Sequence, residues 1–154
     1  MSTGPRASAL LAKLDQERQA FITALAAVPN PEGRRVLEAW DGRDLVIHVA
    51  FWSEHAAGAL EMAATGRGAE FDYDSSQTDA MNAATTANGH ATSLVDAAAR
   101  EAAAFERFRS ALAALGDELL DLQLGNGDSV EDVVRYDGPD HYAEHAAHLR
   151  AATR

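Results

Sequence analysis

The amino-acid sequence predicts an all-α protein, a single domain spanning residues 1–154 and built as a four-helix bundle. Alanine is abundant, and apolar residues recur at intervals of three and four along most of the chain, which is the spacing of amphipathic helices. At 154 residues the chain is long enough for one hydrophobic core without disulfides or structural metals. Four helices of the expected lengths pack most simply as an antiparallel bundle.

The first helix is expected from about Ser8 to Val28. Pro29 and Pro31 should stop it, because proline lacks the backbone N–H that a helix needs to continue. Its charged side should carry Lys13, Glu17 and Arg18, and its apolar side Leu10, Leu11, Leu14, Phe21, Ile22 and Leu25.

The second helix is expected to start near Asp41 and to continue to about Thr65. Asp41 is a suitable N-cap, since its carboxylate can accept the free N–H groups of a first turn. Gly66 and Gly68 should end the helix. This element carries His48, Trp52 and His55.

After a polar crossing at residues 67–76, a long third helix is expected from about Gln77 to Leu115. An interruption near Asn88 and Gly89 is the alternative, because a glycine costs roughly 1 kcal/mol in a helix without forbidding one. The expected core side comprises Leu94, Val95, Phe105, Phe108, Leu112 and Leu115.

The C-terminal part begins with a mixed segment, residues 117–136, in which Ser129 can cap a short helix that contains Asp132. Pro139 stands where the first turn of a helix accepts proline, so the last helix is expected from there to about Ala152.

Composition excludes several classes of function. Cysteine is absent, which removes disulfides, iron–sulfur clusters and a protein thiol nucleophile, so any metal ligands must be nitrogen or oxygen. Thirteen basic and 24 acidic residues give a net charge of −11, which repels nucleic-acid phosphates and anionic lipids. No apolar run approaches the roughly 20 residues of a membrane span. We therefore expect a cytoplasmic protein that acts on a small molecule, with neither nucleic acid nor membrane as a partner.

Histidines are the most informative residues. His141, His145 and His148 stand at i, i+4 and i+7, so a helix places them along one stripe. His48 lies in a strongly apolar stretch that predicts an inward-facing position. If the second and last helices pack together, His48, His141 and His145 can supply three nitrogens to one divalent ion. Such a ligand set favours zinc, nickel, copper or iron(II) over magnesium or calcium.

Plainer explanations compete with this one. A His-x-x-x-His pair near a chain end usually lies on a solvated face, and a lone histidine such as His48 is often a core residue with one hydrogen bond. Glu144 and His148 share the same spacing and form an alternative carboxylate–imidazole set. In the leading hypothesis these two residues are instead catalytic, moving protons or orienting a ligand imidazole through a hydrogen bond.

Two residues of the second helix are candidates for binding a substrate or cofactor. Trp52 follows His48 by one turn and can form an apolar wall beside the ion, with a core position as the alternative. His55 is nearly on the same stripe, and its simpler explanation is a surface position. Tyr142 is expected to serve packing and His90 to be exposed.

Two motifs resemble the DinB-like superfamily, the damage-inducible four-helix proteins also called DinB/YfiT-like metalloenzymes. They are the segment Trp40–Trp52, with His48 inside it, and the closing pair His141 and His145. Asn82 in a long third helix is also similar. The resemblance covers about residues 8–152 and implies an up-down-down-up bundle, a homodimer, a role in stress response, and His48, His141 and His145 as ligands of zinc or nickel.

The branches of that superfamily imply several reactions. They include S-transferases that use the thiols bacillithiol or mycothiol, a mycothiol-dependent maleylpyruvate isomerase, and a colibactin self-resistance branch that hydrolyses a cyclopropane. The isomerase branch resembles a His/Glu/His set, from which His141 departs.

Three hypotheses follow. The first is an enzyme whose metal activates water or a small-molecule thiol, giving a hydrolase or a thiol-dependent S-transferase. The second is a non-catalytic module that binds a small molecule or toxin and confers self-resistance. The third is a purely structural dimer.

Overall fold

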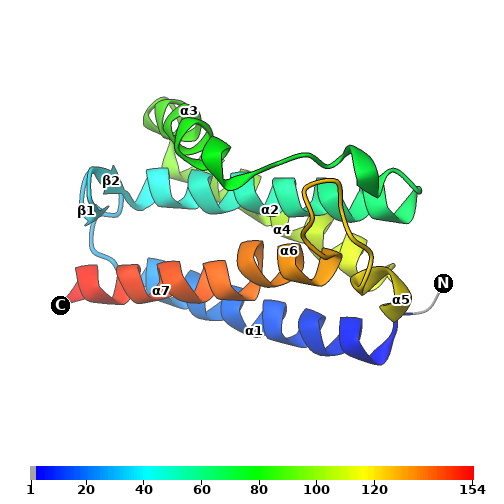
Figure 1. Cartoon of the computed structure of the whole chain (residues 1–154). Coiled ribbons are helices and arrows are strands. Elements are labelled where there is room, and N and C mark those ends of the chain that lie inside the picture. Colours follow the sequence, from blue (N-terminus) through cyan, green and yellow to red (C-terminus); the bar gives the residue numbers. More distant parts are fainter. Residues whose placement is uncertain (1–2) are drawn as a thin grey trace.

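The computed structural model describes residues 3–154, and the fold is all-α apart from one short hairpin (Figure 1). The four longest helices of this part are α1 (Pro5–Ala26), α2 (Gly42–Ala64), α4 (Leu94–Ala113) and α7 (Pro139–Thr153). Helix α2 packs along α4, and α1 packs along α7 (Figure 1). Shorter elements are β1 (Arg35–Leu37), β2 (Trp40–Asp41), η1 (Gly68–Glu70), η2 (Ser75–Gln77), α3 (Thr78–His90), α5 (Asp117–Leu120) and α6 (Val130–Asp137).

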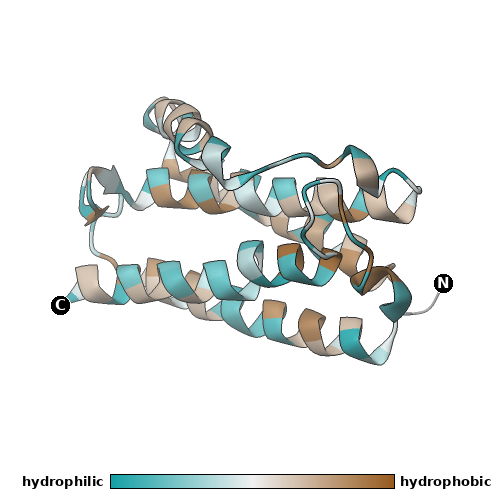
Figure 2. Ribbon diagram, viewed as in Figure 1, coloured by the Kyte–Doolittle hydropathy of each residue, from teal (hydrophilic) through white to brown (hydrophobic). Residues whose placement is uncertain are grey.

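The core is formed by the apolar sides of the long helices, and Figure 2 shows apolar and hydrophilic residues interspersed along each of them, as in amphipathic helices. No helix in residues 3–154 is long and apolar enough to cross a membrane. The largest fully buried apolar side chains include Phe21, Phe108, Tyr142, Leu45, Ile47, Leu60, Leu112 and Leu149.

Helix α1 begins at Pro5, three residues before the expected start, and ends at Ala26, two residues before the expected end. The early start has a distant cause: the carboxylate of Asp117 accepts hydrogen bonds from the backbone N–H groups of Arg6 and Ala7, at 2.9 and 3.0 Å. This contact caps the helix in place of a local side chain.

One side chain of α1 differs from the prediction. Arg18, expected on the solvated side, reaches across to the buried Glu101 of α4 and is only 23% exposed. The expected apolar side is confirmed, with Leu10, Leu14 and Phe21 buried.

Helix α2 begins with the predicted cap. The Asp41 carboxylate accepts hydrogen bonds from the backbone N–H groups of Arg43 and Asp44, and the Asp44 carboxylate accepts one from the N–H of Asp41. This reciprocal arrangement is a capping box. The hairpin β1–β2 comes directly before it and was not predicted. It pairs Leu37 with Trp40 and so brings Trp40 beside the start of α2.

The prediction of one long third helix is wrong. The segment forms two helices, α3 and α4, and the break at residues 91–93 falls just after the glycine suggested as the alternative. Gly89 lies so close to α2 that a Cβ atom there would be 2.8 Å from Asp44 Oδ1. The side chain of Ser93 then caps α4 by accepting the N–H of Asp96.

The new helix start also changes which residues of α4 face the core. Phe105, Phe108, Leu112 and Leu115 are buried as predicted, but Val95 is 78% exposed. Helix α3 lies outside α2 (Figure 1) and buries only Thr85 and Gly89.

The C-terminal elements follow the prediction. Ser129 and Asp132 form a capping box at the start of α6, and Pro139 occupies the first turn of α7, which extends to Thr153. Gly138 joins the two helices where a Cβ atom would be 2.3 Å from the carbonyl oxygen of Val134, so only glycine fits.

Candidate metal centre

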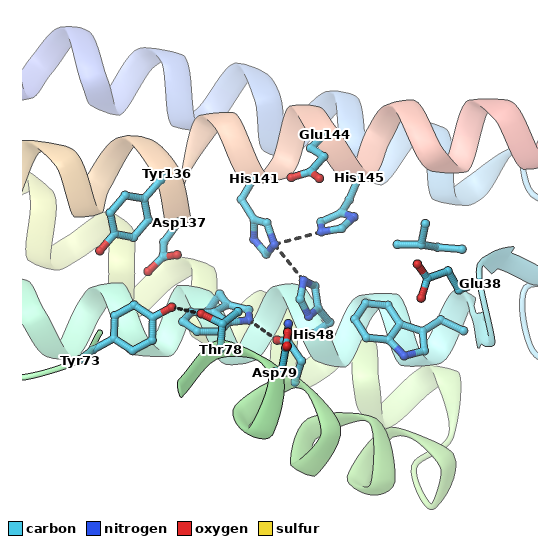
Figure 3. A pocket seen from close by; sticks show the side chains of 14 residues that line it. Glu38, His48, Tyr73, Thr78, Asp79, Tyr136, Asp137, His141, Glu144 and His145 are labelled. Atoms are coloured by element: carbon cyan, nitrogen blue, oxygen red, sulfur yellow. Dashed lines mark hydrogen bonds between the residues drawn. The ribbon is translucent and has the colours of Figure 1, made fainter. Parts of the chain in front are cut away.

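Three histidines from two distant segments meet at one point between α2 and α7 (Figure 3). His48 Nε2 lies 2.9 Å from His141 Nε2, which lies 3.0 Å from His145 Nε2. One nitrogen from each ring falls within 4.8 Å of the others, so this group can hold a metal ion. Nitrogens bound at 2.0–2.1 Å to a tetrahedral ion stand roughly 3.3 Å apart, close to the two measured separations.

Packing on the opposite side of α7 directs these rings. Tyr142, next to His141 in sequence, is buried as expected for a packing residue, with its ring 5.4 Å from that of Phe21 in α1. Because adjacent helical residues differ by about 100° in direction, anchoring Tyr142 in the core turns His141 and His145 toward α2. His48 projects from the buried side of α2, in its N-terminal half, to meet them.

Burial keeps the cluster neutral. Desolvation lowers the pKa of His48 to about 4 and that of His145 to about 3. Burial, together with its two histidine neighbours, also lowers the pKa of His141 well below its usual value. All three rings are therefore uncharged near pH 7, which is the form that offers a lone pair to a metal.

The described protein groups do not complete the hydrogen bonding of these rings. His141 Nε2 faces two nitrogens, yet a neutral ring nitrogen carries either one hydrogen or one lone pair, so it cannot make two good hydrogen bonds at once. The Nδ1 atoms of His48 and His141 are buried and have no hydrogen-bond partner among the described residues. Buried polar atoms are rarely left in this state.

His148 lies behind the cluster rather than in it. Its Nδ1 is 3.1 Å from His145 Nδ1, so it can hold the His145 ring with Nε2 directed at the other two histidines. Glu144 is exposed and lines the neighbouring cavity (Figure 3). Neither residue belongs to the group of side chains that lie close enough to share an ion, so the alternative Glu144–His148 ligand set is not assembled within residues 3–154.

A cavity of about 530 Å³ opens beside the histidines and includes all three in its wall. Trp52 lines it and is 4% exposed, and its indole N–H donates to Asn82 Oδ1 of α3 at 2.8 Å. Trp40 covers His48, with ring centroids 4.6 Å apart. Trp52, for which an apolar wall and a core position were the alternatives, is therefore both: it is buried and it lines the cavity.

His55 does not line this cavity. Its side chain is 15% exposed, so the simpler expectation of a surface histidine is wrong. Its Nδ1 lies 3.4 Å from Asp137 Oδ2, and Asp137 is part of the cavity wall. Burial raises the pKa of the Asp137 carboxyl to about 6, an effect that the His55 contact opposes. His90 is exposed, as expected, with 56% of its side chain accessible.

Several cavity residues were missed from the sequence. Asp137 stood four positions before His141 and eight before His145, so its spacing was a usable signal for the same face. The others come from the β1–β2 hairpin, the segment before α3, α3 itself and the end of α6. Helical spacing within the last helix gives no guide to them. These missed residues are Glu38, Trp40, Tyr73, Asp79 and Tyr136.

No protein-family model, no curated protein and no solved structure matches this chain. The resemblance to the DinB-like superfamily therefore rests on the two motifs alone and remains a prediction.

Proposed function

We propose that His48, His141 and His145 bind one divalent ion, zinc or nickel, and that the protein is a metal-dependent enzyme of the DinB-like type. The observation that supports this most strongly is the meeting of three neutral imidazoles in the wall of a cavity, without enough protein partners for their nitrogens. Three protein ligands on such an ion leave a coordination position free, as in catalytic rather than structural zinc sites.

The ion, when bound, would act as a Lewis acid that lowers the pKa of water or of a small-molecule thiol. The chain itself supplies orientation, through His148 behind His145, and a shielded wall, through Trp40 and Trp52. Glu144 lies at the cavity within reach of solvent and is the proposed proton-transfer residue.

Two reaction types fit this arrangement. Hydrolysis needs only water. S-transfer needs a thiol, which must come from a small molecule such as mycothiol or bacillithiol because the chain has no cysteine. The up-down-down-up connectivity of the bundle, a homodimeric state and a cytoplasmic location belong to the same proposal and rest on the resemblance.

Metal analysis tests the proposal directly. The protein is purified without an affinity tag, dialysed against zinc or nickel, and its bound metal is measured by mass spectrometry alongside His48→Ala, His141→Ala and His145→Ala. We expect one equivalent in the wild type and almost none in the three variants. His90→Ala is the matched control, because it removes an exposed histidine from another part of the surface.

Two results would contradict the proposal: a wild type that binds no metal after dialysis, or a His48→Ala variant with unchanged stoichiometry. Tight binding of small molecules by a protein without metal would instead support the non-catalytic binding module.

A further inference from the structure

The cavity beside the histidines is acidic. Four carboxylates lie in its wall, and no lysine or arginine is found among the described residues that line it. The histidines do not offset this charge, because burial keeps them neutral near pH 7. The carboxylates belong to Glu38, Asp79, Asp137 and Glu144.

Asp137 differs from the other three because it is buried, with only 6% of its surface exposed. His55 contacts its Oδ2 from behind, and no described residue donates a hydrogen bond to its Oδ1. Figure 3 shows the carboxylate beside Tyr136 and above Tyr73, toward the end of the cavity remote from Glu38. Asp137 lines the cavity, so a ligand there can supply its carboxylate with a hydrogen-bond donor that the protein does not.

Two tyrosines accompany Asp137 in this part of the wall, and their hydroxyl groups are engaged elsewhere. Tyr136 donates to Asp128 Oδ2 at 3.0 Å, and the Tyr73 hydroxyl pairs with Thr78. The ring of Tyr73 lies 5.5 Å from that of Trp52. A buried carboxylate beside aromatic rings is the chemistry that recognises an ammonium group, through a charge-assisted hydrogen bond and cation–π contacts.

We propose that the Asp137 end of the cavity binds the ammonium group of an amine-bearing small molecule, the substrate class of the proposed metal centre. That the amine is a substrate rests on the proposed function, but its binding at Asp137 requires no metal. A molecule anchored at Asp137 lies along the cavity wall that contains His141. An anionic substrate, such as the dicarboxylate maleylpyruvate, is repelled by the four carboxylates.

Intrinsic fluorescence reports occupancy of this cavity, because the chain has only two tryptophans and both line it. The probes are three molecules of similar size: 2-phenylethylamine, 2-phenylethanol and 3-phenylpropionate, titrated at pH 7.5 and constant ionic strength. We expect the amine to give a saturable change and to bind at least about tenfold more tightly than the carboxylate, the difference typical of one charge-assisted contact.

The variant Asp137→Asn keeps the size of the side chain and removes its charge, and we expect it to lose about tenfold in affinity for the amine. Glu106→Gln is the matched control: it makes the same change of charge at an exposed position of α4 outside the cavity wall, and it should bind as the wild type does.

Equal binding of amine and carboxylate, no saturable response to the amine, or unchanged affinity in Asp137→Asn would each overturn the proposal. If Asp137→Asn fails to fold by circular dichroism, the comparison of probes on the wild type decides alone. The titration is run on zinc-loaded and on chelator-treated protein. If the protein binds metal but does not prefer the amine over the carboxylate, only the proposed substrate class is wrong. If the protein prefers the amine but binds no metal, only the proposed metal centre is wrong.

Discussion

The two sides of helix α7 carry buried polar groups in opposite states. On one side, the Tyr142 hydroxyl donates to Glu101 Oε1 at 2.7 Å, and the guanidinium of Arg18 donates to both oxygens of Glu101, at 3.1 and 2.8 Å. On the other side, His141 and His145 face one another and His48 without enough partners.

This difference indicates a structural role for the Glu101 network and a ligand-binding role for the histidines. Glu101 is 1% exposed, yet three donors satisfy it, so that network completes itself and ties α1, α4 and α7 together. Burial and the neighbouring carboxylate raise the pKa of Tyr142 well above its usual value, so its hydroxyl stays a donor. The histidines are also largely buried but lack a complete set of partners, and a buried group that the protein leaves without partners indicates a ligand.

Breaking the complete network should have the largest effect on stability. In Arg18→Leu, Glu101 keeps only the Tyr142 hydroxyl, and an uncompensated buried charge costs about 3 kcal/mol, the lower end for buried pairs because Arg18 is 23% exposed. Urea unfolding of the metal-free protein measures the loss. Zinc stoichiometry should not change, because the network lies on the other side of α7.

Arg109→Leu is the matched control for that variant. Its partner is Asp15, and the two side chains are 38% and 40% exposed, so its loss should cost less than about 1 kcal/mol. If both variants lose the same amount, the Glu101 network is not a structural centre and the contrast between the two sides of α7 fails.

Acid should destabilise the metal-free protein through the histidines on the incompletely hydrogen-bonded side of α7. The pKa of His48 falls from an ordinary value of 6.5 to about 4 on burial, so the unfolded chain binds a proton there at a higher pH than the folded chain does. The contribution of neutral His48 to stability is therefore fully present above pH 6.5 and is lost as the pH falls toward 4. Between pH 6.5 and pH 4.5 His48 alone should account for a loss of about 2 kcal/mol in the metal-free protein.

Urea unfolding of chelator-treated protein at several pH values measures this slope. His48→Gln, which cannot titrate, should be less sensitive over the same range. Identical slopes for His48→Gln and the wild type would mean that the cluster is not protected from protonation.

The convergence of the histidines could be predicted because two local rules suffice for it. Helical spacing places His141 and His145 on one stripe, and the apolar neighbours of His48 identify the buried side of its helix. The same rules apply to Asp137, whose spacing fits the stripe, although the glycine and proline that follow it concealed the connection.

The break between α3 and α4 could not be predicted in this way. Alanine-rich sequence favours helix throughout residues 77–115, and the close approach of Gly89 to Asp44 near the end of α3 is a contact between positions far apart in the chain. The position of Trp40 had a similar cause, since it depends on a hairpin too short to show a strand pattern.

A smaller effect should distinguish the ligands from the residue that orients one of them. His148→Ala removes the contact of 3.1 Å that holds the His145 ring, but leaves all three proposed ligands in place. We expect zinc affinity to fall by about tenfold, the low end for groups behind a metal ligand, with one equivalent still bound at saturating zinc. Competition with a chromogenic chelator measures both quantities. A loss of stoichiometry would instead make His148 a ligand.

The smallest expected effect concerns α3, which depends on few contacts although it closes the cavity. Trp52→Phe removes the hydrogen bond of 2.8 Å to Asn82, one of the polar contacts that join α3 to α2. A net contribution of about 1 kcal/mol corresponds to roughly fivefold faster opening, so amide hydrogens of α3 should exchange about fivefold faster.

Trp40→Phe is the control for this last change, because it makes the same substitution in the same cavity without touching Asn82. Exchange in α4 and α7 should be unchanged in both variants. Since α3 buries only Thr85 and Gly89, the core contributes little to its local stability. Unchanged exchange in Trp52→Phe would mean that other contacts hold α3, such as those of Gly89 and His90 with Asp44. In that case the wall of the cavity is anchored at the start of α2 rather than at Trp52.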